Sequence, residues 1–225
     1  MCGRYTIRRP DLIRAGLRHQ PTFGFEEFDE YLTPRFNIAP SQLAPIVRAT
    51  DKGYQLLLAR WGLIPAWSKE KPKVKPINAR CETVATSGMF RQAFQRRRCL
   101  VPADGFLEWQ GAKPPKQPFF IHLKSDSSFA FAGLWEQWKP KDGEPVDTFT
   151  ILTTTPNSLM SPIHNRMPVI LREDEYDRWV GKEHTTDLLR PFDAAGMEAY
   201  KVSSAVNSPK NDNPECVQPV SKPTT

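Results

Sequence analysis

Twenty-two prolines are spread along the 225 residues of the chain, and they limit its fold more than any other feature. Proline fixes φ, lacks an amide hydrogen and disfavours a helical conformation in the residue before it. Many of the segments between the prolines are short and rich in β-branched and aromatic residues. The sequence therefore predicts many short strands and loops in place of a helical bundle.

Strand-like runs dominate the chain. Five of them follow one another between residues 99 and 155, separated by turn residues: CLVPAD, GFLEW, QPFFIHL, SFAFAGLW and DTFTILTTT. LAPIVRAT and YQLLLARWGL predict a hairpin around residues 51–53, and EAYKVSSAV predicts a last strand. Short helices are expected at residues 10–19, 87–98, 173–180 and 184–192. Because strands and helices do not alternate regularly, we expect a single β-rich α+β domain.

The charge balance indicates an anionic partner. The formal charge is +6 and the sequence pI is about 9.2, which favours nucleic acid first. No apolar run approaches the ~18 residues of a membrane span, and no apolar block follows the N-terminal arginines as in a secretory signal. We therefore expect a cytoplasmic protein without membrane contact.

The four cysteines are far apart and form no CxxC pair, which argues against a disulfide framework and against a zinc site. Cys81 and Cys99 are expected to be small buried or half-buried residues. Cys216 lies in a polar, proline-rich C-terminal stretch and is expected to be incidental.

Cys2 follows the initiator methionine, and its small side chain permits ordinary methionine removal. The exposed residue would carry a free α-amine, with an ordinary pKa of about 7.7–8.0, and a thiol, with one near ~8.5. Such a 1,2-aminothiol condenses with an aldehyde to an imine, and the thiol then closes a thiazolidine ring. The alternative is that Cys2 is merely a small residue after Met1.

Three further segments carry groups suited to chemistry. Asn78 and Arg80 are two residues apart and would share one face of a strand, although a turn Asn and a surface Arg fit equally well. Glu108 shares a strand face with Phe106 and suits general acid–base catalysis, unless it points outward. His164 lies in a proline-bounded loop, where it could shuttle protons or bond the backbone.

Basic residues gather in two runs, KEKPKVK at residues 69–75 and QRRR at residues 95–98. Trp61 and Trp67 precede the first run. Basic groups interleaved with aromatic rings suit single-stranded nucleic acid, which offers backbone charge and stacking bases. A solvated charged face is the alternative for each run.

Seven ordered motifs together resemble the SRAP (SOS response-associated peptidase) family: MCGRYT, RFNIAP, RWGLIPAW, INARCET, DGFLEW, IHNRMPVIL and VSSAVNSPKND. The match extends from Cys2 to about Val220. It implies one compact α+β domain over residues 2–220, with a distorted antiparallel β-barrel or sheet core, flanking short helices and a flexible tail at residues 221–225.

The resemblance also implies an activity. Members bind single-stranded DNA in a positively charged groove and form a covalent thiazolidine crosslink to the aldehyde of an abasic site, which shields the lesion from strand cleavage. The resemblance implies crosslink reversal, too, and self-processing of the N-terminus, hence terms such as peptidase, hydrolase and lyase. It implies a monomer without cofactor or metal, associated with the nucleoid if the source is bacterial.

Motif positions assign roles to individual residues. Cys2 matches the crosslinking cysteine, and Asn78, Glu108 and His164 match the catalytic triplet around it. Arg4, Arg80 and Arg166 match positions that hold DNA phosphates. Positions that line the groove or wedge near the lesion are matched by Asn37, Pro40, Trp67, Met89 and Thr153.

Two positions depart from the family pattern. Leu107 replaces a Tyr of DGFYEW, and Asn165 replaces the Asp of IHDR, which puts an orienting carboxylate beside His164 in doubt. Three alternatives stay open: an N-terminal-cysteine glutaminase, since MCG also begins class II glutamine amidotransferases, an autopeptidase that removes only Met1, and a non-covalent DNA-binding module.

Overall fold

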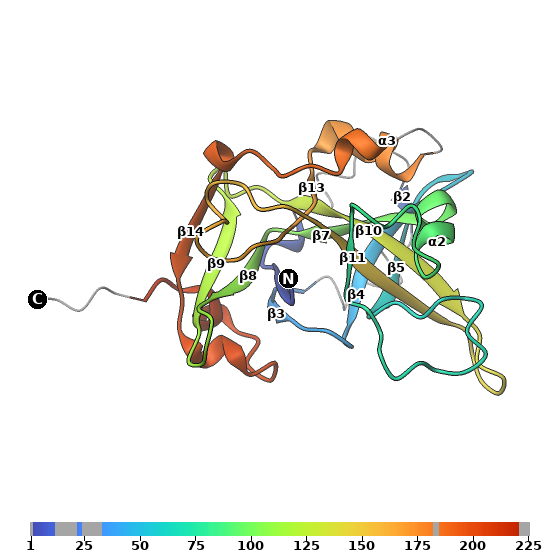
Figure 1. Cartoon of the computed structure of the whole chain (residues 1–225), viewed down its shortest axis with the longest axis horizontal. Coiled ribbons are helices and arrows are strands. Elements are labelled where there is room, and N and C mark those ends of the chain that lie inside the picture. Colours follow the sequence, from blue (N-terminus) through green and yellow to red (C-terminus); the bar gives the residue numbers. More distant parts are fainter. Residues whose placement is uncertain (1, 12–21, 24–32, 182–184, 221–225) are drawn as a thin grey trace, which may run out of the picture.

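The computed structural model describes residues 2–11, 22–23, 33–181 and 185–220 (Figure 1). Five strands close a barrel in the order β5-β4-β7-β10-β11, because β11 pairs with β5 as well as with β10. Their bounds are Leu43–Thr50 (β4), Gly53–Trp61 (β5), Arg98–Ala103 (β7), Phe129–Trp138 (β10) and Val146–Thr154 (β11). Four pairs around the barrel are antiparallel and the closing β11–β5 pair is parallel.

A second, antiparallel sheet has the strand order β14-β9-β8-β1-β3. Its strands are Arg4–Ile7 (β1), Arg35–Ile38 (β3), Gly105–Gln110 (β8), Gln117–Leu123 (β9) and Met197–Lys201 (β14). Strands β8, β9 and β14 lie beside the barrel on the left of Figure 1.

Short elements extend the barrel sheet or pack against one of the two sheets. The strands are Thr22–Phe23 (β2), Asn78–Arg80 (β6), Met167–Pro168 (β12) and Ile170–Leu171 (β13). The α-helices are Arg91–Arg96 (α2) and Tyr176–Val180 (α3). The 3₁₀ turns are Glu173–Glu175, Thr186–Leu188, Ala194–Gly196, Ser204–Asn207 and Pro214–Val217.

Aromatic rings fill the space between the two sheets. Tyr5 of β1 packs edge-on against Trp61 and Phe131, with ring centroids 5.2 and 5.9 Å apart. Phe149 stacks on Trp61, and Phe106 of β8 meets Phe131 edge-on. All five side chains are buried. Edge-to-face pairs of this kind stabilise a packed core, so the Tyr5 ring anchors the N-terminal strand of the second sheet against the barrel.

The chain passes from the barrel to the second sheet at Asp104 and Gly105. A side chain on Gly105 would meet the Phe120 ring at 2.3 Å, so only glycine fits there. The carboxylate of Asp104 is buried and accepts hydrogen bonds from the Thr6 hydroxyl and from two main-chain amides after β1. The DG pair therefore fixes where the N-terminal strand lies.

The prediction of a β-rich α+β fold with a barrel core is confirmed, as are the hairpin at residues 51–53 and the five successive strands. The helix predicted at 87–98 is shorter, because Arg98 already begins β7. Within the range 184–192, where another helix was predicted, the described residues form only a 3₁₀ turn, Thr186–Leu188. Most of the helix predicted at 10–19 and the tail at 221–225 lie outside the described residues.

Two cysteine predictions are confirmed and one is wrong. Cys99 is buried and Cys81 is half-buried. Cys216 is not incidental, because it is 1 % exposed and packs in a small apolar cluster with Leu107 and Phe120. The described part of the chain includes no helix long and apolar enough to cross a bilayer. Those residues also include no His, Cys, Asp and Glu group that could hold a metal.

Candidate active site where the two sheets meet

Cys2 lies directly before β1, which pairs with β3 on one side and β8 on the other. The side-chain amide of Asn78 donates a hydrogen bond of 2.8 Å to the main-chain oxygen of Cys2. Asn78 begins β6, which pairs with β11 of the barrel. This bond joins the N-terminal end of the second sheet to the barrel, and that end lies at the centre of Figure 1.

The thiol of Cys2 is shielded from solvent, with 0 % of the residue exposed. It lies 3.8 Å from the main-chain oxygen of Arg4, to which it donates. Burial, and after it the charge of Glu108, raises the pKa of the Cys2 thiol well above its usual range. The sulfur is therefore a neutral S–H at physiological pH and needs a base before it can act as a nucleophile.

Glu108 stands on β8, on the same face as Phe106 because side chains alternate along a strand. Both residues are buried, and Glu108 is 2 % exposed. The alternative of an outward-facing Glu is therefore wrong. A buried carboxylate whose charge acts on the Cys2 thiol is placed to exchange protons with it.

His164 lies in the loop before β12, and its orientation is fixed by main chain. Its Nδ1 accepts a hydrogen bond of 3.0 Å from the amide of Arg166. Because an accepting Nδ1 carries no hydrogen, the ring proton is on Nε2. The side chain of Gln110, at the end of β8, donates to the main-chain oxygen of Pro162 at 2.9 Å. The loop of His164 is thereby tied to the strand of Glu108.

Thr153, near the end of β11, stands between two of the predicted phosphate-binding arginines. Strand β6 places Arg80 opposite Thr153, and Nη2 of Arg166 donates to the main-chain oxygen of Thr153 at 2.6 Å. Arg80 is exposed and forms no ion pair with any residue that the structure describes. The guanidinium of Arg166 binds the carboxylate of Glu82 through both terminal nitrogens. The two arginines thus approach the end of one strand from opposite sides.

Arg4 and Asn37 are directed toward the C-terminal segment. Nη1 of Arg4 donates to Oδ1 of Asn37 at 3.0 Å and to the main-chain oxygen of Val206 at 2.8 Å. Asn37 is 0 % exposed, and its Nδ2 donates to the main-chain oxygens of Val206, Ser208 and Asn211. Both side chains hold this segment against the second sheet, and their direct contact with DNA stays a prediction.

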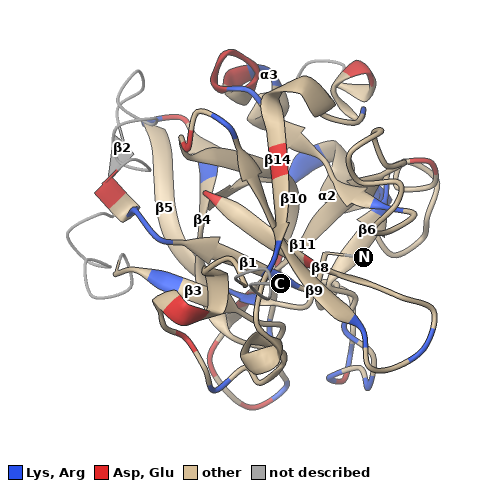
Figure 2. Ribbon diagram, turned by 90° about the vertical axis from the view of Figure 1, so that its left-hand side faces the viewer, with Lys and Arg blue, Asp and Glu red and all other residues tan. Residues whose placement is uncertain are grey.

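The other predicted groove residues differ in exposure. Trp67 is 60 % exposed in the loop between β5 and β6, which also carries the basic run at residues 69–75. Pro40 and Met89 are half-buried. An exposed indole beside several lysines matches the combination that single strands require, stacking surface and positive charge. In Figure 2 Lys and Arg occur on several elements with acidic residues among them, so the net charge is not confined to one element.

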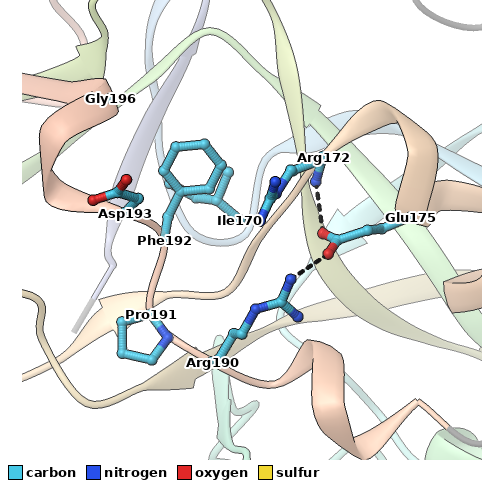
Figure 3. A pocket seen from close by; sticks show the side chains of 8 residues that line it. All are labelled: Ile170, Arg172, Glu175, Arg190, Pro191, Phe192, Asp193 and Gly196. Carbon is cyan, nitrogen blue, oxygen red and sulfur yellow. Dashed lines mark hydrogen bonds and ion pairs between the residues drawn. The ribbon is translucent and has the colours of Figure 1, made fainter.

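A pocket of about 240 Å³ lies elsewhere and includes none of the predicted site residues (Figure 3). Its two arginines flank Glu175, which accepts from the amide of Arg172 and from the guanidinium of Arg190. The lining residues are Ile170, Arg172, Glu175, Arg190, Pro191, Phe192, Asp193 and Gly196.

Three carboxylates that support the site were not predicted. Asp104 holds the segment after β1, and Asp212 accepts from the amides of Phe36 and Asn37 on β3. Glu82 binds Arg166. The only sequence signal for Glu82 was an acidic residue two positions after Arg80 in INARCET. Asp104 and Asp212 left no local signal, because their partners are 95 to 176 residues away.

Comparisons with known proteins identify the family of the chain. The sequence profile of the family "SOS response associated peptidase (SRAP)" matches residues 1–209. The chain is 44% identical to the abasic site processing protein YoqW of Bacillus subtilis, over 97% of this chain and 99% of that protein. It is 34% identical to the abasic site processing protein HMCES of Gallus gallus, over 98% of this chain and 78% of that protein.

Among solved structures, a crystal structure of a Bacteroides thetaiotaomicron protein superposes with a TM-score of 0.86 at 29% identity. The superposition covers 97% of this chain and 100% of the other. Sequence profile, relatives and fold agree over nearly the whole length, and the chain belongs to the SRAP family.

Proposed function

We propose that this protein, once Met1 is removed, binds single-stranded DNA and crosslinks itself to abasic sites through Cys2. The relatives named above are abasic site processing proteins. The observation that carries the proposal is the setting of Cys2, whose carbonyl is held by Asn78 and whose thiol lies in the field of the buried Glu108. Removal of Met1 is a condition of the chemistry, because the nitrogen of Cys2 is otherwise an amide.

The reaction forms two new bonds to one carbon, C1′ of the abasic sugar, and releases one water. The amine of Cys2 attacks C1′ of the ring-opened deoxyribose, and the aldehyde oxygen takes up a proton. Loss of water from the carbinolamine gives an imine. The sulfur then adds to the imine carbon, and its proton passes to the nitrogen to complete the thiazolidine. No oxidation or reduction occurs, so no redox partner is required.

The raised pKa of the Cys2 thiol sets the order of events. A neutral, buried S–H is a poor first nucleophile, so the amine attacks first and the thiol follows. Glu108 supplies a proton as water leaves and accepts the proton of the thiol as the ring closes. The same transfers in reverse would reopen the ring, so Glu108 serves reversal as well.

His164 and Asn78 prepare the reactants. An abasic sugar is mostly a closed ring, and opening it requires a proton on the ring oxygen. The Nε2–H of His164, fixed by the hydrogen bond on Nδ1, is the proton donor that we assign to this step. Asn78 holds the main chain of Cys2, and thus the direction of its amine, so its contribution is positional.

Binding to undamaged backbone comes from charge and stacking. Arg80 and Arg166 flank the end of β11 and would take phosphates on either side of the lesion. Trp67 and the basic run at residues 69–75 would contact neighbouring nucleotides. Such contacts are independent of base sequence, as a lesion-directed protein requires. The product protects the strand, because a thiazolidine has no free aldehyde to promote β-elimination.

A single-stranded oligonucleotide with one abasic site tests the proposal. We expect the wild-type protein to form an adduct that survives boiling in detergent, and Cys2→Ala to bind the DNA without forming it. Cys2→Ser retains the amine, so it should give only a hydrolysable imine that borohydride traps. A wild-type adduct formed at full yield with Met1 still attached, as judged by intact mass, would refute the mechanism.

A further inference from the structure

The ion pair between Glu82 and Arg166 occupies the predicted phosphate site. Nη1 of Arg166 contacts one carboxylate oxygen of Glu82, and Nη2 contacts the other at 2.9 Å. This parallel arrangement is the one in which a guanidinium receives two oxygens of a phosphate. A DNA phosphate and the Glu82 carboxylate therefore compete for the same face of Arg166.

The two partners differ in their freedom to move. The side chain of Arg166 is 11 % exposed and is also held by the main-chain oxygen of Thr153 at 2.6 Å. The side chain of Glu82 is 45 % exposed and stands in the turn after β6, in which the Thr83 amide bonds the Arg80 carbonyl. Rotation of the Glu82 side chain into water would expose Nη1 and Nη2 of Arg166 without any change in the main chain.

We propose that Glu82 is a guard on Arg166, a carboxylate that fills the phosphate-binding fork in the DNA-free protein and is displaced by a backbone phosphate. The inference rests on the proposed function, since it needs DNA as the competing anion. The guard lowers the affinity for any single strand and keeps the guanidinium of Arg166 from holding adventitious anions.

The guard is not switched by protonation at physiological pH. The hydrogen bonds from Arg166 lower the pKa of Glu82 to about 2, so the carboxylate remains an anion. A competing anion is what displaces it. Arg80, on the other side of Thr153, forms no such ion pair with the described residues, so a first phosphate can bind there and deliver its neighbour to Arg166.

A role of Glu82 as a support for Arg166 makes the opposite prediction. Support would mean that loss of the carboxylate disorders the guanidinium and weakens DNA binding. Thr153 already fixes the guanidinium through Nη2, and the main chain of Arg166 is fixed by His164. Arg166 therefore stays in place without Glu82, which favours the guard.

The test measures the affinity for an undamaged single-stranded oligonucleotide by fluorescence anisotropy. All variants carry Cys2→Ala, so that binding is separated from reaction. We expect Glu82→Gln to bind about 3- to 5-fold more tightly, since a half-exposed ion pair is worth up to about one kcal/mol and each 1.4 kcal/mol is tenfold. Glu82→Ala, which removes the acceptor altogether, should show a gain of the same size.

Two controls identify the cause of the gain. Glu70→Gln removes the same charge from an exposed site in the basic run, and a gain below about 2-fold is expected there because screening weakens distant charges. In an Arg166→Gln background, Glu82→Gln should give no gain. Equal gains from Glu70→Gln and Glu82→Gln, persistence of the gain without Arg166, or weaker binding would each overturn the guard.

The outcome separates this inference from the proposed function. If the Cys2→Ala protein binds the oligonucleotide but Glu82→Gln binds no better, only the guard is refuted. If no single-stranded DNA is bound at all, both fail together.

Discussion

At the scale of single residues, His164 explains why a departure from the family pattern is tolerable. The amide of Arg166 orients the ring, because Nδ1 accepts that main-chain hydrogen bond. Asn165 is exposed. We predict that Asn165→Asp changes the initial rate of adduct formation by less than about 2-fold, whereas His164→Gln lowers it by about 10²-fold or more. A tenfold gain in Asn165→Asp would show that a carboxylate at position 165 still orients the ring.

Residue types could be predicted at the site, but their surroundings could not. The aminothiol of Cys2 and the amide of Asn78 are apparent from the sequence, since their chemistry belongs to the residues themselves. The pairing of Arg166 with Glu82, and the burial of Glu108, depend on strands that meet only in the folded chain. Local spacing contains no information about these contacts.

At the scale of elements, the C-terminal segment is part of the second sheet's support. The side chain of Asn37, on β3, donates hydrogen bonds to three main-chain oxygens of this segment. In the other direction, the carboxylate of Asp212 accepts a hydrogen bond from the main-chain amide of Asn37. We predict that Asn37→Ala lowers the free energy of unfolding by about 2–4 kcal/mol, because a buried amide is removed and three carbonyls, one of them buried, lose their donor. Urea unfolding measures this, and the exposed Asn165→Ala serves as the control, with a change within ~0.5 kcal/mol.

DNA binding by the folded fraction of Asn37→Ala distinguishes support from contact. If Asn37 acts through the segment alone, the affinity of the folded protein should fall by less than about 2-fold at a temperature well below the transition, in line with additivity of separate effects. A variant with full stability and tenfold weaker binding would instead favour the contact with DNA that the family resemblance implies.

Long strand-like runs were predictable, and very short elements were not. A run such as QPFFIHL is rich in residues that favour strands and is bounded by turn residues, and β9 has those bounds. Strands β12 and β13 have two residues each and display no period, so only their partners β11 and β10 define them. Helix α2 is shorter than its apolar spacing indicates, because Arg98 pairs with Leu134 in the barrel.

At the scale of the whole molecule, barrel closure and charge placement escape sequence reasoning. The parallel β11–β5 pair joins residues about ninety positions apart in the sequence. A period-two pattern predicts which face of a strand is buried, but it does not predict which strand is its neighbour. The net charge of +6 indicates an anionic partner, but it does not show which arginines are available to it. In the structure Arg80 is exposed and forms no ion pair with the described residues, whereas Arg4 donates to main-chain oxygens of Val206 and Asn207.

That difference predicts unequal salt dependence. Each phosphate contact on a single strand contributes about −0.7 to the slope of log K against log salt concentration. In the Cys2→Ala background, Arg80→Gln should make the slope shallower by about 0.7, because one phosphate contact is lost. Arg4→Gln should leave the slope unchanged, since its guanidinium is engaged by the protein. Anisotropy titrations across a range of salt concentrations measure both, and a shallower slope for Arg4→Gln would mean that Arg4 leaves its carbonyl partners for a DNA phosphate.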